Sequence, residues 1–110
     1  MASITITGSD PITGNLTMSD HGTTNAGVGE VITWVVGPQS GASSITAISK
    51  KPGSTNVFSS GPAKLPGNSK NWQGTTSSDI TVTTTEDYDI FWDDSSGNNH
   101  KYDPKIIINP

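Results

Sequence analysis

Residues 87–93 read Asp-Tyr-Asp-Ile-Phe-Trp-Asp, so polar and apolar side chains alternate along most of the stretch. Tyr88, Ile90 and Trp92 fall on one face of an extended chain, and Phe91 falls on the opposite face among the aspartates. A period of two residues is typical of a β-strand that buries one face. The stretch therefore predicts a half-buried strand with an indole on its inner side.

Shorter segments with the same period lie before and after this stretch. Residues 30–36 carry apolar side chains on both faces, which favours a central strand. Ile45 and Ile48 are three residues apart, which predicts a bulge. Turns rich in Gly, Pro and Asn separate the segments, and loops are expected at residues 23–29 and 60–71. Further strands are expected at residues 3–7, 15–19, 43–49, 56–59, 72–76, 79–84 and 102–108.

The length and the turn-rich composition predict one domain that spans residues 1–110. Close to half of the chain is Ser, Thr, Gly or Asn, while three Trp and regularly spaced Ile and Val supply a core. Short strands at spacings of about 10–12 residues favour two packed sheets. We predict an all-β protein, a single immunoglobulin-like antiparallel β-sandwich of about 7–9 short strands. Because the chain has no Cys, the likeness to immunoglobulin domains concerns architecture alone.

The charge pattern excludes several classes of partner. The chain has six Lys, no Arg and a formal net charge of −4. Neutralising phosphates needs a basic face, so we expect no nucleic acid partner. No run approaches the roughly 20 apolar residues of a membrane helix, so we expect no membrane insertion. The partners left are a second copy of the chain, another protein, or glycans.

The compartment stays open. The N-terminal residues lack the basic and long apolar regions of a signal peptide. The absence of Cys is compatible with both reducing and oxidising compartments. The composition, rich in Ser, Thr, Gly and Asn, is of the kind found in extracellular proteins.

Several short motifs occur together along most of the chain, from residue 16 onward. They include Val31-Ile32-Thr33-Trp34, Tyr88-Asp89-Ile90-Phe91-Trp92 and the ending Tyr102-Asp103-Pro104-Lys105-Ile106. In these motifs the chain resembles a group of small uncharacterised bacterial immunoglobulin-like β-sandwich proteins. The resemblance implies one domain with this strand order, and it implies no activity.

An acidic cluster lies towards the end of the chain, between residues 86 and 103. Ca²⁺ takes about six to eight oxygen ligands, many of them carboxylates held in loops. Asp93, Asp94 and Asp103 are therefore candidate metal ligands, and Ca²⁺ is the one cofactor that the sequence suggests. The spacing is not that of a helix–loop–helix calcium site. The alternative is a solvated hairpin tip, in which Asp and Asn are present for turn geometry.

The aromatic residues divide into core and surface candidates. Trp34 and Trp92 alternate with Ile and Val, so we expect them in the core. Trp72 follows a polar stretch and Phe91 faces away from Trp92, which makes both candidates for exposed rings that stack on sugars. The candidate ligand-binding residues, with the amides of the hairpin tip, are Trp72, Phe91, Asn98 and Asn99.

Catalytic arrangements find little support in the sequence. His21 and His100 lie in polar contexts, where a hydrogen-bonded surface role competes with metal ligation. Asp87 and Asp89 share one face of a strand, as surface charges commonly do, and a small sandwich offers little cleft for hydrolysis. We therefore expect no catalytic residues and no enzyme activity.

The ends of the chain are prone to form strands. The run Ile106-Ile107-Ile108, flanked by Lys105 and Pro110, either pairs within its own sheet or adds to the sheet of a partner. The leading functional hypothesis is a non-catalytic structural or interaction module that associates with itself or joins a larger assembly. The alternative is a carbohydrate-binding, lectin-like module, with or without Ca²⁺.

Overall fold

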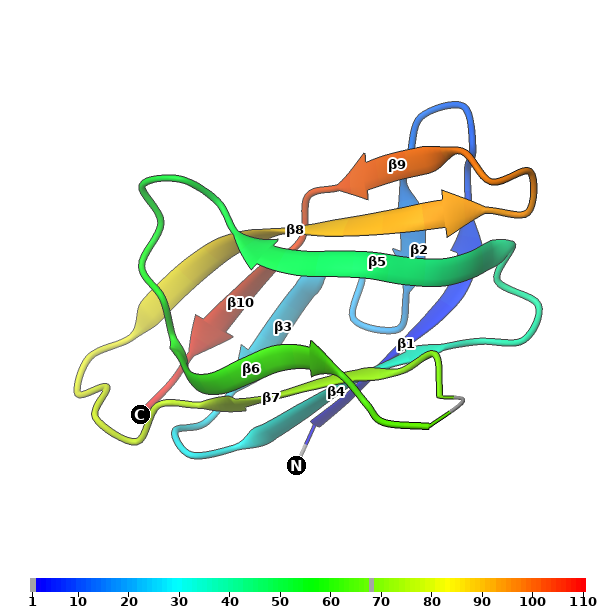
Figure 1. Ribbon diagram of the computed structural model, residues 1–110. Helices are drawn as coiled ribbons and strands as arrows, with labels where there is room; N and C mark the ends of the chain where they lie inside the picture. The colour runs from blue at the N-terminus through cyan, green and yellow to red at the C-terminus, as the bar shows by residue number, and fades with distance from the viewer. Residues whose placement is uncertain (1, 68) are drawn as a thin grey trace.

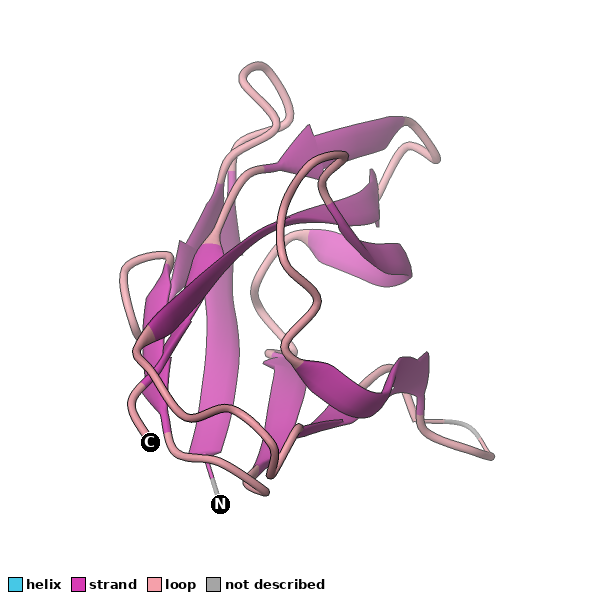
Figure 2. Ribbon diagram, turned by 90° about the vertical axis from the view of Figure 1, so that its left-hand side faces the viewer, coloured by secondary structure: helices cyan, strands magenta, loops and turns pink. Residues whose placement is uncertain are grey.

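Alternating side chains produce ten strands in the computed structural model, which describes residues 2–67 and 69–110. The strands are β1 (Ala2–Ser9), β2 (Leu16–Met18), β3 (Thr23–Ala26), β4 (Val31–Val36), β5 (Ala42–Lys50), β6 (Phe58–Lys64), β7 (Trp72–Thr76), β8 (Thr84–Asp94), β9 (Asn99–Tyr102) and β10 (Lys105–Ile108). They form two sheets that face each other across one core (Figures 1 and 2). None of the described residues belongs to a helix that could serve as a membrane span.

The strand order differs from an antiparallel sandwich at two places. One sheet has the order β2-β1-β4-β7-β6, and the other has the order β3-β10-β8-β5, with β9 also paired to β8. Strands β1 and β4 run parallel, as do β10 and β3. The all-β, two-sheet prediction is confirmed. The antiparallel prediction is wrong for these two pairs, and the described residues form ten strands rather than the predicted 7–9. The periodicity of a single strand says nothing about the direction of its neighbour, so the sequence pattern could not show this.

Several element bounds also differ from expectation. The loop expected at 23–29 contains β3, whose small residues pair with β10 but give little apolar signal. The loop expected at 60–71 contains most of β6. The strand expected at 79–84 does not form, and Val82 is 69% exposed there. The strand expected at 102–108 is divided into β9 and β10, because Pro104 has no N–H to donate to a ladder.

Both β-prone ends of the chain are fully paired within the fold. Strand β10 lies between β3 and β8, and β1 lies between β2 and β4. Of the two alternatives for Ile106-Ile107-Ile108, pairing within the domain is therefore confirmed. The bulge predicted near Ile45 is also confirmed, since the register between β5 and β8 shifts between Ile45 and Ala47.

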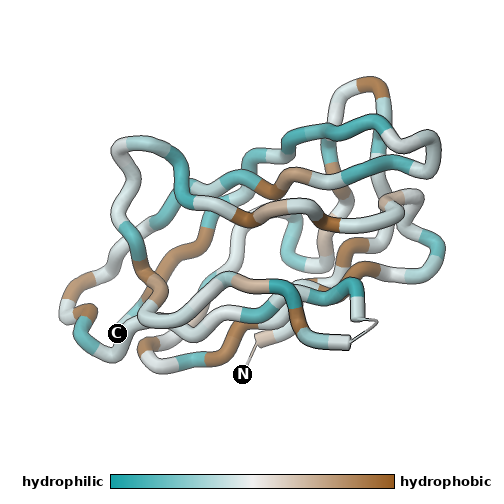
Figure 3. Tube along the Cα trace, viewed as in Figure 1, coloured by the Kyte–Doolittle hydropathy of each residue, from teal (hydrophilic) through white to brown (hydrophobic). Residues whose placement is uncertain are grey.

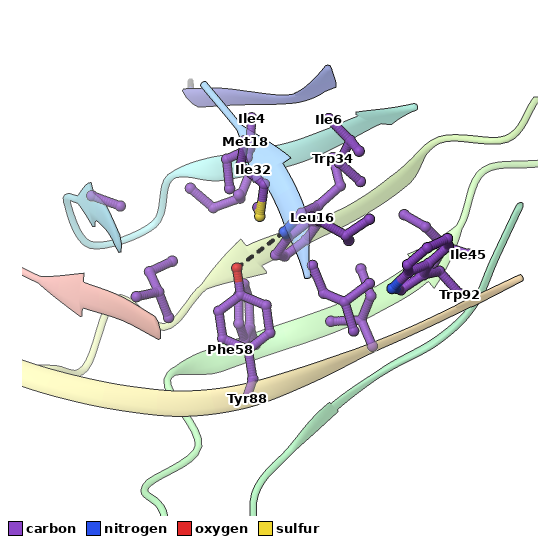
Figure 4. Close-up of a cluster of buried hydrophobic side chains, with 14 of the residues drawn as sticks. Ile4, Ile6, Leu16, Met18, Ile32, Trp34, Ile45, Phe58, Tyr88 and Trp92 are labelled. Carbon is purple, nitrogen blue, oxygen red and sulfur yellow. Dashed lines mark hydrogen bonds between the residues drawn. The ribbon is translucent and has the colours of Figure 1, made fainter. Parts of the chain in front are cut away.

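The core is built around two indoles and a phenol, as predicted for Trp34 and Trp92 (Figure 4). Trp34, from β4, donates its Nε1–H to the hydroxyl of Tyr88, from β8, at 3.2 Å, and the two rings meet edge to face at 6.0 Å and 72°. Trp92 donates its Nε1–H to the carbonyl of Gly14 at 2.9 Å. Each buried polar aromatic atom in these contacts thus has a partner, which is the condition for burying it at low cost.

The most deeply buried carboxylate lies near this core. Glu86, on β8, is 2% exposed and accepts a hydrogen bond from the backbone N–H of Val57 at 3.0 Å. Val57 lies directly before β6, so this bond also links the two sheets. Burial raises the pKa of Glu86, and the hydrogen bond from Val57 only partly opposes that shift.

We expect Tyr88→Phe to lower the free energy of unfolding by about 1–3 kcal/mol, because the buried Trp34 N–H loses its acceptor. Urea denaturation followed by tryptophan fluorescence measures the change. Tyr102→Phe is the matched control, since Tyr102 is only partly buried and its hydroxyl has no hydrogen-bond partner among the described residues. An equal effect of both substitutions would contradict the role given to the Trp34–Tyr88 bond.

Glu86→Gln should change how stability depends on pH. A raised pKa means that Glu86 contributes most to stability below the pKa of unfolded Glu, and that this contribution is lost as pH rises through the folded pKa. The free energy of unfolding of Glu86→Gln, relative to the wild type, should therefore increase as pH rises from the pKa of unfolded Glu through the raised pKa of folded Glu86. Asp79→Asn, which removes an exposed carboxylate, controls for net charge. A difference in the free energy of unfolding between Glu86→Gln and the wild type that stays constant with pH would disprove the effect.

Candidate functional site

The two outer faces of the sandwich differ in charge. The five strands of the sheet β2-β1-β4-β7-β6 contain a single charged residue, Lys64, at the end of β6. In the other sheet, β8 alone carries five acidic residues, and Figure 3 shows hydrophilic residues concentrated along the β8–β9 hairpin. Of these five, Asp87, Asp89 and Asp93 lie on the outer face of β8, whereas Glu86 and Asp94 lie on its inner side. Three acidic residues of β8 therefore distinguish the outer faces of the two sheets.

The first candidate surface is named here the uncharged face. Its side chains are small or uncharged, and most are partly buried by their neighbours across the strands. Gln73 donates its Nε2–H to Oγ1 of Thr33 at 3.2 Å. A shallow hollow of about 280 Å³ lies at one end, between Thr5, Thr7 and the segment 37–40. The uncharged face consists of Thr5, Thr7, Thr17, Val31, Thr33, Val35, Gln73 and Thr75.

The second candidate surface is the outer side of β5, β8 and β9, named here the hairpin face. Phe91 lies at its middle, opposite Ala47 on β5 and Lys101 on β9. Two residues along β8, Asp93 lies opposite Asn99. The Nδ2 group of Asn99 donates to Oδ1 of Asp93 and to Oγ1 of Thr46, each at 3.0 Å. The amide of Asn99 is therefore held in one orientation on the face that carries Phe91.

An ion-paired group closes the other end of the hairpin face. Lys51 donates to Oδ1 of Asp103 at 2.8 Å and also to Oδ1 of Asp89. The hydrogen bonds to Asp103 and Asp89 raise the pKa of Lys51, and the bond from Lys51 lowers the pKa of Asp103. Both carboxylates are therefore engaged by a cation of the chain itself.

Asp94 lies on the inner side of the same hairpin and closes its turn. Its Oδ1 accepts the backbone N–H groups of Ser96 and Asn98, at 2.8 and 3.0 Å, and its Oδ2 lies 2.8 Å from Nε2 of His100. The bond with His100 and then that from Asn98 lower the pKa of Asp94. The ring of His100 stacks on Trp92 at 4.6 Å, so this pair is part of the packing of the hairpin.

The structure brings together only part of the predicted site. Phe91, Asp93 and Asn99 share the hairpin face. Asn98 lies at the exposed tip of the turn, and Trp72 faces inward from β7 opposite Trp34 and packs against the core. Trp72 is therefore partly buried rather than freely exposed, because its alternation with Gly74 and Thr76 turns it towards the other sheet.

The predicted metal ligands do not converge. Asp93 and Asp103 are held by Asn99 and Lys51, and Asp94 is turned to the inner side of β8. Within residues 2–67 and 69–110, no group of three or more His, Asp or Glu side chains is arranged to hold a metal ion.

Sequence reasoning missed Lys51 and Thr46. Lys51 is 38 residues from Asp89 along the chain, and Thr46 is the extra residue at the bulge of β5. Nothing in the local pattern of either residue indicates its partner, because the pairing of β5 with β8 determines both contacts.

Comparison with known proteins identifies no relative of the chain. No protein-family model matches the chain, and no curated protein matches it in sequence.

Proposed function

We propose that the protein is a non-catalytic module that associates with a second copy of itself through the uncharged face. The observation that carries the proposal is the separation of charge between the two sheets, with one charged residue in the five strands behind this face. The centres of protein interfaces are depleted in charged residues in the same way.

The net charge of the chain supports this choice of surface. Two copies that each carry a formal charge of −4 repel one another. The uncharged face is the surface on which they meet without placing carboxylates against carboxylates. Sheets also stack face to face at about 10 Å when their outward side chains are small or of moderate size, such as Thr and Val.

The strands at the edges of the sheets favour association through the uncharged face over edge-to-edge strand pairing. The longest edge strand is β5, which pairs only with β8 and shifts register twice along its length. The opposite edge strand of the other sheet, β6, contains Pro62 and an irregular register with β7. Bulges and Pro are features that protect edges against pairing with another chain.

We also propose that the sandwich is immunoglobulin-like. Two packed sheets of short strands support an immunoglobulin-like architecture, while the parallel pairs β1–β4 and β10–β3 depart from antiparallel immunoglobulin sheets. The likeness to small bacterial sandwich proteins stays a prediction.

Sedimentation velocity over a range of concentrations tests the association. We expect the weight-average mass to rise from one chain towards two. We also expect added salt to strengthen association, because salt screens the repulsion between like-charged copies. A strict monomer at the highest concentration that stays in solution would retire the proposed function.

Thr33→Lys then tests the surface. Thr33 lies on β4, the middle strand of the uncharged face, and a two-fold interface there would bring two new cations close together. We expect the dissociation constant of the dimer to rise at least about tenfold, which corresponds to about 1.4 kcal/mol. Ser49→Lys adds the same charge to the edge strand β5 and should leave association unchanged. The reverse ranking of the two variants would indicate pairing through the β5 edge.

A further inference from the structure

We propose that the hairpin face binds neutral saccharides, with Phe91 as the platform on which a sugar ring stacks. This site lies on the sheet opposite the uncharged face, so it does not depend on self-association. The ring, its fixed polar neighbours and the balance of charge around it each support the assignment.

Phe91 is set apart from the other aromatic side chains. Trp34, Phe58, Tyr88 and Trp92 are buried in the core, and Trp72 and Tyr102 pack against it. Phe91 belongs to neither group and lies on the outer face of β8. Its neighbour on β5 is the small Ala47, and its neighbour on β9 is Lys101. The ring is partly exposed between them. A partly exposed ring with polar neighbours is an arrangement suited to an amphipathic ligand.

Polar groups flank the ring on both sides along the strand. Asp93 and Asp89 are each two residues from Phe91, which places them about 7 Å away on the same face. On one side, Asn99 is fixed by Asp93 and Thr46. On the other side, Lys51 fixes Asp89 and Asp103. The span between the two polar groups accommodates a single sugar ring above the phenyl ring.

The chemistry of the polar groups favours a neutral ligand. Sugar hydroxyls both donate and accept hydrogen bonds, and the two ends of the face offer carboxylate and amide oxygens together with the remaining ammonium hydrogen of Lys51. Lys51 is paired with Asp89 and Asp103. Lys101, which lies opposite Phe91 on β9, is offset by Asp93, so the face has no surplus of cations to attract an acidic sugar. Because Asp93 and Asp103 are engaged by side chains of the protein, we assign recognition to these groups without a metal ion.

NMR titration of the ¹⁵N-labelled chain tests the proposal. The probes are methyl β-D-glucopyranoside, methyl α-D-mannopyranoside, methyl β-D-galactopyranoside and N-acetyl-D-glucosamine, each with and without EDTA, and D-glucuronate as an acidic comparison. We expect at least one neutral probe to shift amide signals of β8 and β9 around Phe91, Asp93 and Asn99, unchanged by EDTA and more strongly than glucuronate. No shift with any neutral probe, shifts elsewhere, loss of binding in EDTA, or stronger shifts with glucuronate would each overturn the proposal.

Variants connect the shifts to the ring. Phe91→Ala should weaken binding at least about tenfold, whereas Phe91→Trp should retain it. Val82→Ala removes an exposed apolar side chain from the β7–β8 connection and should leave binding unchanged. Since Phe91 is outside the core, the variants should keep the wild-type circular dichroism spectrum. Equal binding by the wild type and by Phe91→Ala would overturn the role of the ring. If the chain is strictly monomeric and still binds a neutral probe, saccharide binding is supported although self-association is not.

Discussion

The hydrogen-bonded contact between Trp34 and Tyr88 is the interaction on which the rest of the structure depends. It joins β4 of one sheet to β8 of the other, and both residues are essentially inaccessible to solvent. Since side chains alternate along a strand, placing these two rings inward determines which residues of both strands face outward. Thr33 and Val35 then belong to the uncharged face, and Phe91 and Asp93 belong to the hairpin face.

This constraint explains why the outer faces of the two sheets can differ so strongly in charge. Both sheets bury apolar side chains towards the same core, so the inner positions resemble one another. The outer positions are free of that requirement, and here one sheet presents Thr and Val while the other presents Asp, Asn and Lys around a phenyl ring. Two proposed roles, self-association and sugar binding, therefore use opposite sides of a single core without sharing a residue.

The inner residues could be predicted from the sequence, and the pairing of strands could not. Alternation correctly placed Trp34, Tyr88 and Trp92 inside and Phe91 outside, because each of these follows from a period of two within one strand. The same rule failed for residues 79–83, where alternating Thr and Val have no neighbouring strand to pair with. It also could not bring Lys51 to Asp89, or Asn99 to Thr46, because those contacts depend on which strands are neighbours. Phe91, Asp93 and Asn99 were recognised as candidates, but their common face became visible only once β9 was paired with β8.

Hydrogen exchange of the indole N–H groups, followed by NMR, tests the packing of the two sheets around Trp34 and Tyr88. We expect the Trp34 indole proton to exchange only on global unfolding and to show nuclear Overhauser contacts to the ring of Tyr88. Exchange of that proton as fast as in an exposed indole, or no contact with Tyr88, would contradict the packing of the two sheets around this pair.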